Sequence, residues 1–166
     1  PVSEEIRKIL VSGKVNKMDS FSEFLCFSAS RREHINKVIL PALESGKIVI
    51  CDRYLDSSIV YQGLVGGVDL DIIRSIHKNF CYDLYPDLTI LLNINPKIGL
   101  KRKKNSPLLE DRFENFDFKF HQMIQNKFLD VAKIFSNRIK IIDSNNNKDF
   151  VFDLVIEKIK HFFKDN

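Results

Sequence analysis

The sequence predicts an α/β protein built on a parallel sheet. Short apolar runs at 48–51, 88–94 and 139–142 are typical of strands that are buried on both faces. Longer stretches with apolar residues at helical spacing separate these runs. This alternation of helices with short strands indicates the α/β class, in which ligands bind outside the carboxyl ends of the strands.

Capping residues and apolar spacing locate the helices before the first strand. Ser3 and the two acids after it predict the start of a helix, and Gly13 is suited to end it. A long helical segment is expected over 19–45, with Asp19 at its start. Pro41 is expected to kink or break this segment, because proline has no backbone N–H to donate.

The remaining elements follow the first strand in regular alternation. Residues 55–62 predict a short helix, after which Gly63, Gly66 and Gly67 predict a flexible loop. His77 lies on the next helix and is expected at the surface, although a ligand role is the alternative. The later helices are expected at 69–81, 96–104, 115–135 and 149–163.

Composition excludes several classes of protein. The chain has 166 residues and a net charge of +4, which fits a phosphate-bearing ligand but is too small to indicate nucleic-acid binding. No apolar run approaches the roughly 20 residues of a membrane-spanning helix, and no signal peptide is evident. The three cysteines lack metal-ligand spacing, so we expect buried thiols and a reducing, cytoplasmic location. They are Cys26, Cys51 and Cys81.

Two groups of residues have the chemistry of a nucleotide site. Asp52 and Arg53 directly follow the first predicted strand, where they could hold a metal-bound water and a phosphate. Alternatively, they form an ion pair that closes the strand. Phe27 and Arg31 are four residues apart, so a ring and a guanidinium share one helix face and could bind a planar base. The alternative is a core phenylalanine beside a surface arginine.

A basic, proline-broken segment follows the second predicted strand. It begins with four consecutive cations at 101–104 and continues to the charged residues at 110–114. A segment of this kind is suited to a mobile flap over phosphates, or it is a solvated loop.

In their order and spacing, these features resemble the thymidylate kinases, P-loop kinases that phosphorylate dTMP. The block from Asp52 to Gly63 is the most specific part of the resemblance, which spans almost the whole chain. The matching segments are 27–34, 41–47, 52–54, 57–58, 61–63, 86–89, 99–102, 111–114 and 120–121. The resemblance implies a P-loop NTPase-like three-layer sandwich, with helices on both faces of the sheet, and one nucleoside-monophosphate-kinase domain over 1–166.

The resemblance also implies the reaction, its cofactor and the roles of individual residues. ATP would phosphorylate dTMP with the help of Mg²⁺, in a protein that forms a homodimer and binds neither nucleic acid nor a membrane. The implied dTMP-binding residues are Arg7, Phe27, Arg31, Arg53, Ser58, Tyr61 and Gln62. The implied catalytic residues are Asp52, which would hold Mg²⁺ through water, Arg53, and Arg102, Lys103, Lys104 and Arg112 of a lid at about 101–114. Arg102, Asn145 and Asn147 are implied to bind ATP.

The family's first strand, its P-loop and its second strand have no counterpart in these residues. No GxxxxGK[ST] motif occurs, so we expect the parent protein to carry this part and residues 1–166 alone to be inactive. Two rival functions remain at this point. One is another nucleotide kinase, acting on UMP, AMP or a deoxynucleoside, and the other is a non-catalytic nucleotide-binding relative.

Overall fold

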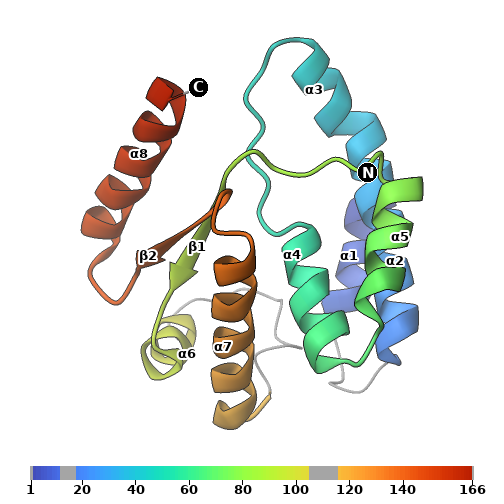
Figure 1. Ribbon diagram of the computed structural model, residues 1–166. Helices are drawn as coiled ribbons and strands as arrows, with labels where there is room; N and C mark the ends of the chain where they lie inside the picture. Colours follow the sequence, from blue (N-terminus) through green and yellow to red (C-terminus); the bar gives the residue numbers. More distant parts are fainter. Residues whose placement is uncertain (1, 12–17, 105–115, 166) are drawn as a thin grey trace. The chain divides into compact units, whose positions relative to one another are not determined.

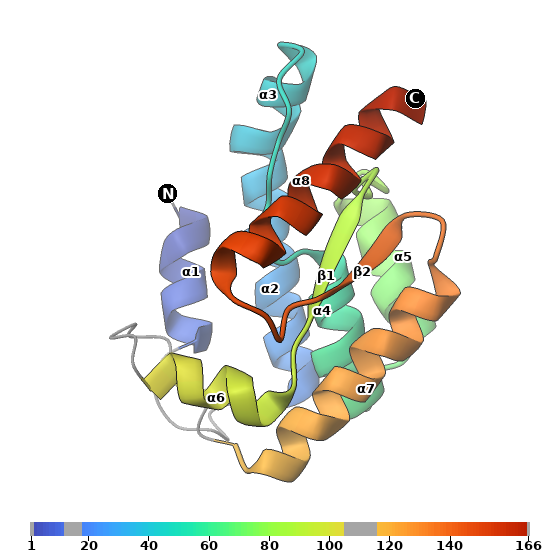
Figure 2. The ribbon, with the colours of Figure 1, turned by 90° about the vertical axis from the view of Figure 1, so that its left-hand side faces the viewer.

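A computed structural model of the chain describes residues 2–11, 18–104 and 116–165 (Figures 1 and 2). The described chain divides into two compact units. The first unit contains the described residues up to Tyr85 together with Phe116, and the second contains 86–104 and 117–165. None of the described helices combines the length and the apolar character that a membrane crossing requires.

The first unit is helical (Figure 1). Its elements are α1 (Val2–Val11), α2 (Ser20–His34), the π-helical η1 (Ile35–Ile39), α3 (Leu40–Glu44), α4 (Leu55–Ser58), the π-helical η2 (Ile59–Val65) and α5 (Leu70–Phe80). Asp19 begins α2 as predicted, because its side chain accepts hydrogen bonds from the N–H groups of Phe21 and Ser22 at 3.0 and 2.9 Å. Asp69 begins α5 in the same way.

The long predicted segment at 19–45 is helical throughout, with one irregularity before Pro41. Within η1 the N–H of Leu40 donates to the carbonyl of Ile35, which is the i to i−5 pattern of a π-helix. A proline removes the next backbone donor, so a locally widened helix accommodates it. The expected irregularity therefore takes the form of a π-helical turn.

The core of the first unit lies around α2. Phe24, Ile35, Val60 and Ile73 are completely buried, and α1 runs alongside α2 (Figures 1 and 2). Gly63 allows η2 to pack closely on α5, because a Cβ at this position would lie 2.6 Å from Cδ2 of Leu70. The predicted loop of glycines is therefore wrong at Gly63, which is buried inside η2.

Two other predictions for the first unit are wrong. Residues 48–51 do not form a strand, and the side chains of Ile48 and Ile50 are 72% and 90% exposed. A strand needs a neighbour for its N–H and C=O groups, and no described strand pairs with this segment. His77 is not at the surface, because it is 1% exposed and its Nε2 lies 2.9 Å from the carbonyl oxygen of Leu84.

The second unit contains a parallel pair of strands with three helices. Its elements are β1 (Thr89–Asn93), α6 (Pro96–Lys104), α7 (Phe118–Ile134), β2 (Ile139–Asp143) and α8 (Lys148–Asp165). The two strands pair in register from Thr89 with Ile139 to Asn93 with Asp143 (Figure 2). The parallel pairing confirms the predicted class. Burial on both faces is not complete, because Leu92 and Ile141 are exposed.

Candidate functional site

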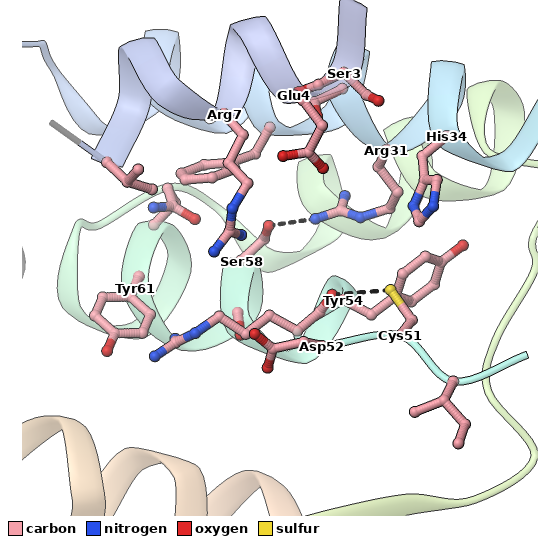
Figure 3. Close-up of a pocket in the computed structure, with 17 residues that line it drawn as sticks. Ser3, Glu4, Arg7, Arg31, His34, Cys51, Asp52, Tyr54, Ser58 and Tyr61 are labelled. Carbon is pink, nitrogen blue, oxygen red and sulfur yellow. Dashed lines mark hydrogen bonds between the residues drawn. The ribbon is translucent and has the colours of Figure 1, made fainter. Parts of the chain in front are cut away.

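The first unit contains a cavity of about 430 Å³ (Figure 3). Side chains from α1, α2, the 50–54 segment, α4 and η2 line it. The serine hydroxyl of Ser30 donates to the carbonyl of Ser3 at 3.0 Å, which ties α2 to α1 at its edge. The cavity therefore lies between α1 and α2 on one side and the 50–54 segment, α4 and η2 on the other.

The structure brings together every described residue of the first unit that the sequence assigned to a site. All of them line the cavity, although they come from four different elements and the 50–54 segment. They are Arg7, Phe27, Arg31, Asp52, Arg53, Ser58, Tyr61 and Gln62. Figure 3 shows Arg7 extending from α1, and Arg31 from α2, toward Ser58.

Arg31 is the buried cation of the cavity, not a surface arginine. Its Nη2 donates to Oγ of Ser58 at 2.6 Å, and its guanidinium lies 5.5 Å from the ring centroid of Tyr54. Its Nη1 is buried and has no hydrogen-bond partner among the described residues. Burial lowers the pKa of Arg31, an effect that Cys81 and Tyr54 oppose. Arg31 can therefore donate a strong hydrogen bond to a molecule in the cavity.

Arg53 has an unusual backbone conformation. Its φ is 62°, in the left-handed region that side chains with a Cβ rarely adopt. Its guanidinium lies 5.6 Å from the ring centroid of Tyr61, and its carbonyl accepts a hydrogen bond from Sγ of Cys51 at 3.3 Å. Such strain is often found at binding sites, where the fold holds a side chain in a required direction.

Cys51 itself is exposed, so the expectation of three buried thiols is wrong at this position. Cys81 is buried and Cys26 is partly buried, and all three cysteines are free thiols. Burial raises the pKa of the Cys81 thiol.

Glu23 supports the site, and sequence reasoning missed it. It is 6% exposed, and its Oε2 accepts a hydrogen bond at 2.7 Å from Nε2 of Gln62, which is 2% exposed. The signal was present in the sequence, because Glu23 precedes Phe27 by four residues and Arg31 by eight. This spacing places all three side chains on one face of α2.

Tyr54 was also missed as a site residue. It lines the cavity, its hydroxyl is buried without a hydrogen-bond partner among the described residues, and its ring meets that of His77 edge to face. Burial raises the pKa of Tyr54 well above its ordinary value, although Arg31 lowers it.

The residues assigned to ATP lie in the second unit. Arg102 donates to the carbonyl oxygens of Ser144, Asn145 and Asn146 at 2.9, 3.1 and 2.7 Å, so α6 is tied to the turn after β2. The side chain of Asn147 accepts a hydrogen bond from the N–H of Phe150 in the first turn of α8. Lys103 and Lys104 belong to α6, but their side chains, like all of Arg112, lie outside the described residues.

Comparison with known proteins decides the family. A model of the thymidylate kinase family matches residues 1–155. The chain belongs to the thymidylate kinase family. It is 39% identical over 159 residues to the thymidylate kinase of Geobacillus sp. (strain WCH70), with 95% of this chain and 76% of that protein covered. It is 35% identical over 162 residues to the thymidylate kinase of Ligilactobacillus salivarius (strain UCC118), with 97% and 78% covered.

A solved structure gives the same family. The crystal structure of thymidylate kinase from Ehrlichia chaffeensis matches with a TM-score of 0.71 and 33% identity, covering 95% of this chain and 72% of that chain. The predicted P-loop NTPase fold class is therefore confirmed, and the rival nucleotide kinases are not favoured. Among the described residues, no group of three or more His, Cys, Asp or Glu side chains could hold a metal ion.

Proposed function

We propose that the cavity of the first unit binds dTMP, and that the protein transfers a phosphoryl group to it from ATP to give dTDP and ADP. Family membership supports the reaction. The observation that supports the location is the cavity itself, because all the residues assigned to dTMP line it. A nucleoside monophosphate needs an aromatic face, base-edge donors and acceptors, and cations for its phosphate, and the cavity contains each of these.

Each part of dTMP has a counterpart in the cavity. The ring of Phe27 would stack on thymine, and Arg31 and Gln62 would face the edge of the base with Ser58 beside them. Tyr61 would lie against the sugar, where a ring excludes a 2′-hydroxyl. Arg7 and Arg53 would bind the phosphate, and two cations would orient it for attack on the γ-phosphate of ATP.

Mg²⁺ fits the carboxylates available at the cavity. Asp52 and Glu4 both line it, and Mg²⁺ in kinases uses few carboxylates, several waters and the phosphates of the substrate. We propose that Asp52 holds the ion through water. When bound with ATP, the ion neutralises charge on the phosphates.

We propose further that ATP lies against Arg102, Asn145 and Asn147, and that the lid at about 101–114 supplies Lys103, Lys104 and Arg112. The hydrogen bonds from Arg102 to the turn at 144–146 support a common location for Arg102 and Asn145. We also propose that the protein forms a homodimer and that it is cytoplasmic.

A panel of nucleoside monophosphates tests the reaction. The full-length protein would be assayed with ATP, Mg²⁺ and dTMP, dUMP, UMP, AMP or dCMP, and formation of ADP and of each diphosphate would be measured. We expect the highest kcat/KM for dTMP. A preference for AMP or UMP would replace this proposal with the rival kinase, and binding of dTMP without turnover would indicate a non-catalytic relative.

A further inference from the structure

The contact between Glu23 and Gln62 has a consequence for base selection, which rests on the proposed function. A carboxylate can only accept hydrogen bonds, so the Gln62 atom that lies 2.7 Å from Oε2 of Glu23 must be the amide nitrogen. The nitrogen is therefore turned toward α2. Gln62 also lines the cavity, and its oxygen is the amide atom that can accept a hydrogen bond from a molecule there.

Arg31 provides the opposite hydrogen-bonding character. Its Nη2 donates a hydrogen bond to Oγ of Ser58, and Arg31 lines the cavity beside Ser58. A guanidinium can only donate hydrogen bonds. The cavity thus presents a donor from α2 and an acceptor from η2, and both side chains are less than a tenth exposed.

The donor of Arg31 and the acceptor of Gln62 match the hydrogen-bonding groups of a keto pyrimidine. They do not match those of an amino pyrimidine. Thymine has an acceptor at O4 and a donor at N3–H, whereas cytosine has a donor at N4 and an acceptor at N3. With cytosine, a donor would face Arg31 and an acceptor would face Gln62. Buried polar groups left unpaired in this way are costly, so the arrangement discriminates strongly.

We propose that Glu23 is a positioning residue that fixes the amide of Gln62 with its oxygen toward the base, and thereby selects thymine over amino pyrimidines. Glu23 does not line the cavity, so its effect passes through Gln62. Glu23 and Gln62 are 39 positions apart in the sequence, so local patterns in the sequence do not reveal the pair.

The test compares dTMP with 5-methyldeoxycytidylate, which keeps the methyl group and the shape of thymidylate but reverses the polarity of the base edge. In Glu23→Gln, the new amide can either donate or accept a hydrogen bond. The side-chain amide of Gln62 can then rotate by half a turn, so that its nitrogen faces the base. We expect the ratio of kcat/KM for dTMP to that for 5-methyldeoxycytidylate to fall at least about tenfold, mainly through KM. The matched control is Glu44→Gln on the exposed end of the same helical segment, which should leave the ratio unchanged.

A second variant keeps the proposal testable if Glu23→Gln folds poorly. The exchange Glu23→Gln with Gln62→Glu restores an amide donor facing a carboxylate and again presents only acceptors to the cavity, so discrimination should return. An unchanged ratio in folded Glu23→Gln, or equal losses for both nucleotides with no recovery in the exchanged pair, would overturn the role of Glu23. Failure of the wild type to phosphorylate dTMP would instead count against the proposed function.

Discussion

Arg31 Nη2 lies 2.6 Å from Oγ of Ser58, and this hydrogen bond joins α2 to the end of α4 inside the cavity. Both side chains are buried. The bond holds the guanidinium in one orientation at the wall of the cavity. Recognition at this site therefore depends on the contact between two helices as well as on the arginine.

The neighbouring arginines of α2 provide a matched pair of variants. Arg31→Met should weaken dTMP binding by about 1.5–3 kcal/mol, because a charged hydrogen bond to the base is lost. Arg32 points elsewhere, donating to the carbonyl of Phe80 and lying 5.3 Å from the ring centroid of Tyr82. Arg32→Met should lower stability without changing dTMP affinity, as measured by calorimetry. Equal affinity losses in both variants would contradict the assignment of Arg31.

The positive φ of Arg53 predicts that two variants lose the same activity but differ in stability. Arg53→Ala and Arg53→Gly should both lose most turnover, because the phosphate loses a cation. Glycine tolerates a φ of 62° whereas alanine does not, so the glycine variant should be more stable than the alanine variant by about 1 kcal/mol. Denaturant unfolding and the kinase assay measure the two effects. Near-normal turnover in either variant would contradict the role of Arg53 in binding the phosphate.

Stacking on Phe27 can be separated from general packing of α2. Phe27→Ala should weaken dTMP binding by about 1–3 kcal/mol, the usual worth of stacking between a base and an aromatic ring. Phe21, on the same helix, packs on Phe24 and does not line the cavity. Phe21→Ala should therefore leave the dissociation constant for dTMP unchanged. Unaltered dTMP affinity in Phe27→Ala would exclude the stacking role.

Buried His77 predicts a loss of stability in mild acid. Burial lowers the pKa of His77, although the hydrogen bond to Leu84 opposes this. The unfolded chain binds the proton near pH 6.5 and the folded chain only at lower pH, so the free energy of unfolding should fall as the pH drops from about 7 to 5. His77→Phe keeps the ring beside Tyr54 and Tyr85 and should flatten this dependence.

Denaturant unfolding between pH 5 and 8 measures the effect. Hydrogen bonds from Ser22 lower the pKa of Asp19, which moves its titration away from this window. A wild-type curve that is flat from pH 7 to 5 would contradict the buried neutral state of His77.

Arg102 should stabilise the turn that follows β2. Arg102→Ala removes three hydrogen bonds to the carbonyls of 144–146, and we expect faster amide hydrogen exchange in this turn and a higher KM for ATP. Arg102→Lys should not restore the turn, because one ammonium cannot reproduce the fork of a guanidinium. Lys101→Ala, at an exposed position of α6, is the control. Unchanged exchange at 144–146 in Arg102→Ala would contradict this role.

Much of the fold could be predicted because its signals are local. Asp19 and Asp69 mark the starts of α2 and α5 by capping chemistry alone, and Phe27 and Arg31 share a helix face through their spacing. The clustering of Arg7, Arg31 and Arg53 came from the family resemblance, since these residues are distant in sequence.

The errors concern properties that depend on distant neighbours. The run at 48–51 is apolar, but an apolar run forms a strand only where another strand pairs with it. His77 is buried because Tyr54, Leu84 and Tyr85 surround it, and nothing on its own helix indicates this. The π-helical turns and the Glu23–Gln62 contact likewise follow from packing between elements.

Among the described residues, 17 line the cavity, and all 17 come from the stretch between Ser3 and Gln62. In the proposed function, the described residues that recognise the acceptor nucleotide therefore belong to one stretch of the sequence, well short of half of the 166 residues. Recombination between relatives at a junction after Tyr85 would transmit this pocket as an intact block. In such chimeras the nucleotide preference would be inherited from the parent that contributes the earlier stretch.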